Sequence, residues 1–281
     1  MALKQANLVA EAIKRKNPMV QCEIVVIKTQ GDVLIKQSLT SFGGKGVFVT
    51  AIEEALEQGQ VDIAVHSAKD LPMELMDGMQ IISVLKREDP RDVLVMRKEN
   101  VGKQKLIVGS SSLRRSEQIR CLMQNCEIQD IRGNVPTRIQ KVKEGRYDAT
   151  ILAMAGLKRL SLMQEEELVY RPFEIEEMIP AGCQGIIAVE MKKTHPQKAF
   201  IEGIGDEITK QVFEIERGIL QSLGAGCHEP VGVVATPKDH SFFVQLYQKK
   251  DARTRKVEFE LEGGESWEKY ILWEPDLEIR N

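Results

Sequence analysis

The sequence has little of what marks a membrane-spanning or exported protein. No stretch approaches the roughly 18 uninterrupted apolar residues that a membrane helix requires. The segment after Met1 soon becomes amphipathic, without the apolar core and small-residue cleavage site of a signal peptide. We therefore expect a cytoplasmic protein that does not span a bilayer.

Cysteine is also scarce. The five cysteines are Cys22, Cys121, Cys126, Cys183 and Cys227. Their odd number argues against a disulfide framework, and no Cys-x-x-Cys pair or Cys/His cluster has the spacing of a zinc site. We expect reduced thiols and no bound metal.

An excess of charge of one sign is lacking as well. The chain carries 39 Lys and Arg against 42 Asp and Glu, a formal net charge of −3, so no broad basic surface for nucleic acid is predicted. Any anionic ligand must be bound by a local group of cations. With 281 residues, of which 42% are hydrophobic, the chain can form two or three globular domains at roughly 150 residues or fewer each.

Apolar strands alternate with polar loops and helices over most of the chain. Residues 61–65 are predicted to form a buried strand that leads into His66–Pro72, and residues 106–108 a strand that leads through a serine-rich loop into a helix. This order predicts a mainly parallel, doubly wound α/β sheet. The β-branched run Glu23–Lys28 is also predicted to be a strand.

The domain boundaries follow from a hinge and a returning strand. Pro90 and the charges around it predict a hinge at 87–91, and the apolar strand 186–191 is expected to return to the first lobe. Alternating segments after a long helix that begins at Asp206 predict a small α+β unit. We expect three domains: residues 1–86 with 183–203, residues 91–178, and residues 205–281.

An unusual concentration of arginine lies between Ser111 and Arg138. This stretch has five arginines, no lysine and three acids, and its two loops place backbone N–H groups at helix N-termini. The planar guanidinium suits carboxylates and phosphates, so the pattern indicates an anion-binding cradle. For any single arginine, a plain surface position is about equally common.

Two further positions have a possible chemical role. Asp70, beside Lys69, is either an ion-paired N-cap or a carboxylate that protonates a leaving group, and spacing does not decide. Free cysteines are usually buried small apolar residues, but the glycines around Cys227 favour an accessible sulfur. His66 is expected to be a structural histidine with a hydrogen-bond partner.

Several motifs occur in a recognisable order. They are VHSAKDLP at 65–72, REDPRD at 87–92, GSSSLRR at 109–115, RGNVPTR at 132–138 and Gly226-Cys227. Together they closely resemble the hydroxymethylbilane synthase family, also called porphobilinogen deaminase. The resemblance runs from about Ala2 to Gly232.

The resemblance implies a fold and an activity. The fold is α/β, with two periplasmic-binding-protein-like doubly wound lobes and a small α+β C-terminal domain. The activity is the head-to-tail condensation of four porphobilinogen molecules with loss of ammonia, followed by hydrolysis to hydroxymethylbilane. The family carries a dipyrromethane cofactor, joined by a thioether to the cysteine that matches Cys227, and its catalytic aspartate matches Asp70. A monomer that binds porphobilinogen and oligopyrrole intermediates, but no nucleic acid or membrane, is expected.

The resemblance also implies which residues bind the carboxylates of the cofactor and the substrate. They are Arg114, Arg115, Arg132, Arg138, Arg159, Lys69, Ser67, Ser110, Ser112, Gly133 and Gln184, with Lys45 in a loop that covers the cleft.

Three departures from the family pattern lead to a further expectation. Family members begin with a strand and an Arg-x-Ser motif ahead of the segment like Ala2–Ala6, commonly have lysine where Ser41 stands, and end in a further helix. We expect a chain without these parts to be less stable and weakly active or inactive. The alternatives are a truncated, inactive family member and a two-lobed protein that binds anionic ligands. The second does not account for Cys227 or Asp70.

Overall fold

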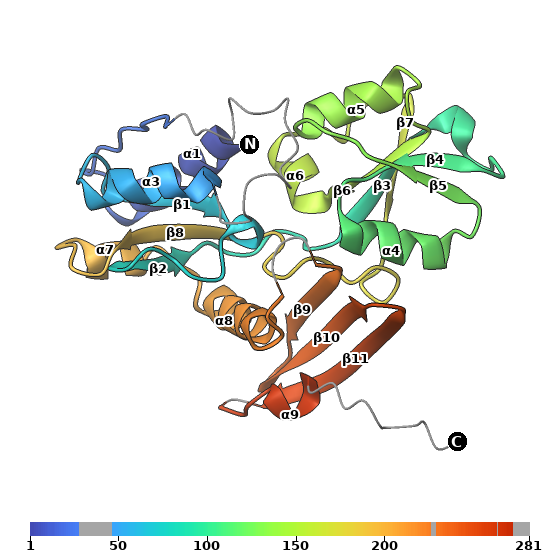
Figure 1. Cartoon of the computed structure of the whole chain (residues 1–281). Coiled ribbons are helices and arrows are strands. Elements are labelled where there is room, and N and C mark those ends of the chain that lie inside the picture. Colours follow the sequence, from blue (N-terminus) through green and yellow to red (C-terminus); the bar gives the residue numbers. More distant parts are fainter. Residues whose placement is uncertain (28–46, 226–228, 263, 272–281) are drawn as a thin grey trace.

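The computed structural model describes residues 1–27, 47–225, 229–262 and 264–271. Within these residues the strands form three separate sheets, each with its own helices (Figure 1). The expectations for Lys45, Ser41, Cys227 and the chain end concern residues outside this part. None of the helices described combines the length and apolar character needed to cross a membrane.

The first sheet contains strand β8, which comes from much later in the chain than its neighbours. Its order is β1 (Ala64–Ser67), β8 (Ile187–Lys192), β2 (Met79–Val84), and β8 is antiparallel to both neighbours. The expected return of this strand to the first lobe is confirmed. Because β8 arrives from the second sheet, it runs against β1 and β2 and separates two strands that share a direction.

Helices pack on both faces of this sheet. They are α1 (Ala2–Lys16), α3 (Val47–Glu57) and α7 (Lys198–Glu202). Val9 and Ile13 of α1 share an apolar core with Val189, whereas Leu56 of α3 packs with Ala64. Ala64 is paired with Glu190, the neighbour of Val189 on β8. Because neighbouring residues of a strand point to opposite sides, α1 and α3 lie on opposite faces of the sheet.

The strand predicted over Glu23–Lys28 is wrong for residues 23–27. This segment belongs to none of the described sheets, and Val25 and Val26 are 52% and 67% exposed. β-Branched residues favour an extended backbone, but a strand also needs a neighbour that pairs with its N–H and C=O groups. No described strand supplies that pairing.

The second sheet is mixed and has five strands. Its order is β5 (Cys126–Gln129), β4 (Leu106–Gly109), β6 (Ala149–Ala153), β3 (Asp92–Arg97), β7 (Leu168–Pro172). Strand β4 is parallel to β5 and β6, whereas β3 is antiparallel to β6 and β7. The carboxyl ends of β4 and β5 therefore lie at the same edge.

Helices cover both faces of the second sheet, as expected for a doubly wound unit. They are α4 (Leu113–Leu122), α5 (Val135–Lys143) and α6 (Met154–Arg159), and a short 3₁₀ turn, Lys98–Asn100, follows β3. Ile119 of α4 packs with Leu94 and Ile151 on one face. Val142 and Leu157, from α5 and α6, pack with Val93 on the other.

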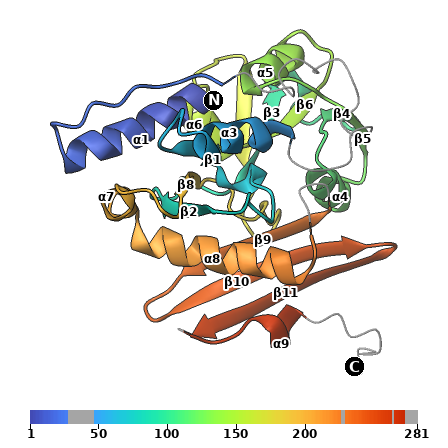
Figure 2. The same ribbon diagram turned by 60° about the vertical axis from the view of Figure 1, so that its left-hand side comes forward.

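The third sheet confirms the small α+β unit. It is antiparallel, with strands β9 (Val231–Pro237), β10 (Ser241–Lys250) and β11 (Arg253–Glu262), and with helices α8 (Glu207–Ser222) and α9 (Glu268–Ile271) (Figure 2). Helix α8 lies between the first and third sheets, and one apolar core joins Val84, Ile219 and Val244. The three domain ranges stay a prediction.

Candidate active site

Gln184 lies where the chain passes between the first and second sheets. Its Nε2 donates to the carbonyl oxygen of Pro90 at 2.7 Å and to Asp92 Oδ1 at 2.9 Å. Its Oε1 accepts a hydrogen bond from Lys69 Nζ at 3.2 Å and from an Nη of Arg115 at 3.4 Å. One buried amide thus connects residues from both sheets and from both crossing segments.

The backbone around Gln184 requires unusual conformations. Cys183 has φ 60° and Gly185 has φ 89°. A Cβ atom at Gly185 would lie 2.2 Å from the carbonyl oxygen of Glu88, so only glycine fits there. The Gly185 carbonyl accepts hydrogen bonds from Glu88 N at 3.1 Å and from Arg159 at 2.6 Å. Strained backbone of this kind is typical of functional sites.

Asp92 forms ion pairs with two of the arginines that are predicted to bind carboxylates. It is fully buried, with Arg114 Nη1 2.8 Å from Oδ2 and Arg115 Nη2 2.8 Å from Oδ1. Burial alone would raise the pKa of Asp92, but the two guanidinium groups outweigh it and hold that pKa well below its usual range. Arg114 also donates to Ile179 O and Arg115 to Ile151 O.

Serines shape the loop between β4 and α4. Ser112 is the N-cap of α4, and its side chain accepts from Arg115 N at 3.5 Å. The buried Ser110 accepts a hydrogen bond from Ser112 N at 3.3 Å. Ser111 Oγ donates to Ile131 O at 2.5 Å, which joins this loop to the loop after β5.

The loop after β5 carries Arg132 and Gly133, and Arg138 lies near the start of α5. Arg132 is 50% exposed and lies 2.9 Å from the exposed Asp130. Arg138 Nε donates to Gly133 O at 2.7 Å, and Gly133 has φ 115°. Burial lowers the pKa of Arg138, and repulsion from Arg115 lowers it further. The arginines at the starts of α4 and α5 are therefore close enough to affect each other's charge.

The turn that follows β1 brings Ser67, Lys69 and Asp70 to the same region. Ser67 and the buried Gln5 of α1 exchange hydrogen bonds at 2.8 and 3.2 Å. Burial lowers the pKa of Lys69; Asp70 opposes this, and Arg115 adds to it. Asp70 ends a 3₁₀ turn, Ala68–Asp70, whose N-cap is Ser67, and its side chain is exposed. The N-cap interpretation of Asp70 is therefore wrong.

The chain is similar to known proteins of one family. Residues 1–199 match the family described as "Porphobilinogen deaminase, dipyromethane cofactor binding domain". A porphobilinogen deaminase from Acetivibrio thermocellus is 43% identical over 234 residues, 82% of this chain and 78% of the relative. One from Clostridium botulinum is 36% identical over 261 residues, 91% of this chain and 88% of the relative.

The chain belongs to the porphobilinogen deaminase family. Among solved structures, an arginine-bound substrate-binding protein of an amino acid ABC transporter from Streptococcus pneumoniae matches with a TM-score of 0.40. It is 15% identical and covers 78% of this chain and 80% of its own. The periplasmic VFT2 domain of BvgS from Bordetella pertussis has a TM-score of 0.42 and 12% identity, covering 76% and 82%.

Sequence reasoning missed residues that organise this candidate site. Asp92 stands within the motif at 87–92, and an aspartate that opens an apolar strand signals a buried partner. Arg87 donates to both carboxylate oxygens of the fully buried Glu216, at 2.5 and 3.2 Å. Glu216 also accepts from Cys183 N at 2.5 Å and Ala235 N at 2.8 Å, so α8 fixes the crossing segment to β9.

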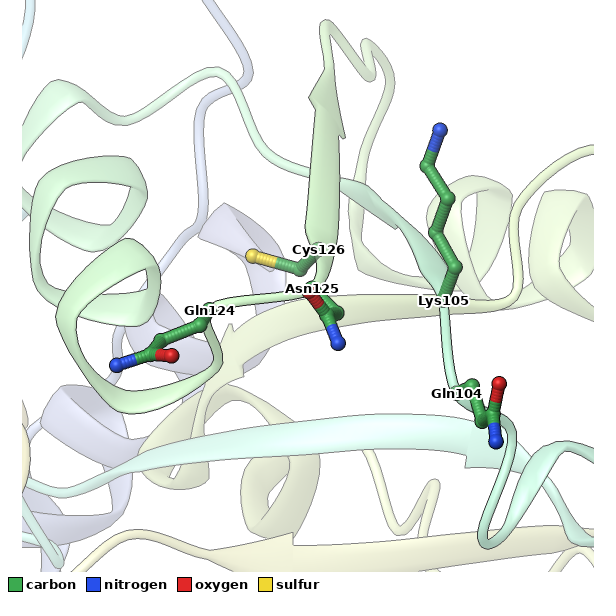
Figure 3. Close-up of a pocket in the computed structure, with 5 residues that line it drawn as sticks. All are labelled: Gln104, Lys105, Gln124, Asn125 and Cys126. Carbon is green, nitrogen blue, oxygen red and sulfur yellow. The ribbon is translucent and has the colours of Figure 1, made fainter.

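A surface pocket of about 300 Å³ lies away from this site. Gln104, Lys105, Gln124, Asn125 and Cys126 line it. These residues precede or begin β4 and β5, so the pocket lies at the amino ends of strands whose carboxyl ends carry the arginine loops. Its side chains point in different directions, with the Lys105 amine turned away from the others (Figure 3).

Proposed function

We propose that this chain is a hydroxymethylbilane synthase, which condenses four porphobilinogen molecules head to tail with release of ammonia. The observation that carries the proposal is that Lys69, next to Asp70, and Arg115 both donate to Gln184 Oε1, in a chain of the porphobilinogen deaminase family. Gln184 thus brings together cations from two sheets, and one of them, Lys69, directly precedes the exposed Asp70. A cytoplasmic monomer is part of the proposal and rests on the family relationship alone.

The cationic residues fit a cofactor and a substrate that carry two carboxylates on each pyrrole ring. Arg132 lies just before α5 and Arg138 near its start, and both carry guanidinium N–H groups that can donate to a carboxylate. The half-buried Arg159 donates to the carbonyl oxygen of Gly185. We propose that they bind carboxylates together with Lys69, Ser67, Ser110, Ser112, Gly133 and Lys45. Cys227 would hold the dipyrromethane cofactor through its thioether, and the cofactor would supply the nucleophilic carbon that starts the chain.

Arg114, Arg115 and Gln184 are proposed to have a double role. Their donors already bind Asp92 and backbone carbonyls, which fixes the guanidinium planes. A fixed guanidinium binds a carboxylate with less loss of conformational entropy than a mobile one. These residues therefore both hold the two sheets together and present oriented donors to the ligand.

Asp70 is proposed as the acid that acts on each incoming substrate. It supplies the proton with which the aminomethyl nitrogen leaves as ammonia, and its carboxylate then stabilises the positive charge left on the substrate. The ammonium group of Lys69, one residue earlier, keeps Asp70 within a region of positive charge. The same region attracts the substrate carboxylates.

Intact-protein mass spectrometry with a hydroxymethylbilane assay tests this proposal. We expect an adduct of two pyrrole units on the purified chain that is absent in Cys227→Ala. Asp70→Asn should keep the adduct but lower turnover about 10²- to 10⁴-fold, the usual contribution of a general acid. Asp77→Asn, an exposed aspartate beyond the same loop, is the matched control. An unmodified, inactive chain that still binds oligopyrroles would instead indicate an anion-binding protein.

A further inference from the structure

Two buried glutamates contact the chain on either side of the turn that carries Asp70. The proposed chemistry does not use them. Glu53 on α3 is 6% exposed and Glu190 on β8 is fully buried. Helix α3 lies over β1 and β8 (Figure 1), and Leu56 packs there against Ala64. Burying two acids side by side is costly unless each is paired or protonated.

The contacts of this acid pair, Glu53 and Glu190, are specific. His66 Nε2 lies 2.8 Å from Glu190 Oε2, and Met76 N donates to Glu53 Oε1 at 2.8 Å. The Glu190 carboxyl group is also close enough to Glu53 to raise its pKa. Two ionised carboxylates repel each other at close range, and one proton held between them would remove this repulsion.

The surroundings of Glu53 disfavour its charged form. Burial and the neighbouring Glu190 raise the pKa of Glu53, and the opposing effects of Met76 N–H and His66 are smaller. In the described part of the chain, no N–H or hydroxyl group donates to the buried Glu190 Oε1. A proton on Glu53 would supply the donor that Glu190 Oε1 lacks, while His66 contacts the other oxygen.

These contacts close a loop around Asp70. His66 precedes Asp70 on β1, and Met76 follows it on the way to β2. His66 binds Glu190 and Met76 binds Glu53, so the acid pair joins the two ends of the loop 66–76. The buried Leu71 and a hydrogen bond of 2.9 Å from Arg217 to Met73 O support the loop from the side of α8.

We propose that Glu53 and Glu190, joined by one shared proton and by His66, are positioning residues that fix the loop 66–76 and thereby place Asp70. The positioning of Asp70 for catalysis rests on the proposed function, whereas the shared proton and the closed loop do not. The groups that face Glu53 are Glu190 on β8, His66 on β1 and the Met76 amide. A displacement of about 1 Å in a catalytic group can lower turnover about 10²-fold.

Three variants test the acid pair: Glu53→Gln, Glu53→Leu, and Glu54→Gln as a control on the exposed neighbouring position. The side-chain amide introduced by Glu53→Gln can donate to Glu190 and accept from Met76, so turnover should be retained. The apolar side chain introduced by Glu53→Leu can do neither, so kcat should fall about 10²-fold with little change in KM. Amide exchange of residues 66–76 should be faster in Glu53→Leu only, and Glu54→Gln should match the parent in every measurement.

The dependence of stability on pH tests the shared proton separately. Because the folded pKa of Glu53 is raised above its unfolded value, its stabilising contribution is complete below about pH 4.3 and is lost as the pH rises through the folded pKa. Glu53→Gln should lack this decline. A decline of the same size in Glu53→Gln would overturn the shared proton.

The two possible failures remain separate. Parent-like kcat and amide exchange in Glu53→Leu would overturn the positioning role. If the parent chain forms no hydroxymethylbilane, the proposed function fails, and amide exchange together with the pH profile still decides whether the acid pair closes the loop.

Discussion

The two arginine-containing segments, residues 110–115 after β4 and residues 132–138 after β5, look alike in sequence and differ in structure. Each follows a strand of the same parallel pair, β4 or β5, and each opens a helix. Arg114 and Arg115 after β4 are buried and paired with Asp92, whereas Arg132 after β5 is half exposed and pairs with an exposed aspartate. The same residue type therefore stabilises the junction of the sheets in one loop and remains accessible to a ligand in the other.

The positions of the two strands explain this difference. Strand β4 lies between β5 and β6, inside the sheet. The start of α4, which follows β4, is covered by two other parts of the chain: Arg114 donates to the carbonyl oxygen of Ile179 in the crossing segment and lies against Gly232 of β9. Strand β5 is at the edge of the sheet in the described residues, and its helix begins at the surface. A buried charge needs a partner, and Asp92 on β3 provides one for two arginines.

The largest expected effect is that of Asp92→Asn. The change leaves two buried guanidinium groups without a counter-charge, so the free energy of unfolding should fall by about 3–5 kcal/mol. Urea denaturation measures this loss. Asp130→Asn, which removes the partner of the exposed Arg132, is the matched control and should cost less than about 1 kcal/mol. Equal losses in the two variants would contradict the comparison.

The same pair predicts a difference in acid sensitivity. The pKa of Asp92 is lower in the folded than in the unfolded chain, so its contribution is present at neutral pH and is lost as the pH falls below about 4. The free energy of unfolding of Asp92→Asn should therefore depend less on pH in the acid range than that of the parent. Denaturation curves between about pH 5 and pH 2.5 measure this, and parallel acid profiles would contradict it.

The sequence predicted much of the local structure and little of the contacts across the junction. Strand, loop and helix order is local, and so are the loops that carry Ser110, Ser112 and Gly133. The contact of Lys69 with Gln184 joins residues 115 positions apart, and no local pattern reports such a pair. The strand at 23–28 was predicted for the same local reason and is wrong over 23–27, because strand pairing depends on a neighbour.

A smaller effect on stability, but a clear one on function, is expected for Arg132→Gln with Arg138→Gln. Arg132 pairs only with an exposed aspartate and Arg138 donates to the carbonyl oxygen of Gly133, so the free energy of unfolding should change by less than about 1 kcal/mol. Each lost charge-assisted contact to a ligand carboxylate is worth about 1.5–3 kcal/mol, so kcat/KM should fall at least about tenfold. Steady-state kinetics with porphobilinogen measure this. Unchanged kinetics would remove these arginines from the ligand set.

The helix caps provide the smallest and most local test. Asn134 Oδ1 accepts from Thr137 N at 3.0 Å and caps a helix whose first turn is exposed, so Asn134→Ala should cost about 1 kcal/mol. Ser112 accepts from Arg115 N at only 3.5 Å, and α4 is also held by Arg114 and by two hydrogen bonds of 2.9 Å between Gln118 and Ile179. Ser112→Ala should therefore cost less than about 0.5 kcal/mol. Urea denaturation of both variants measures the order, and a larger loss for Ser112→Ala would mean that α4 depends on its cap more than on its buried arginines.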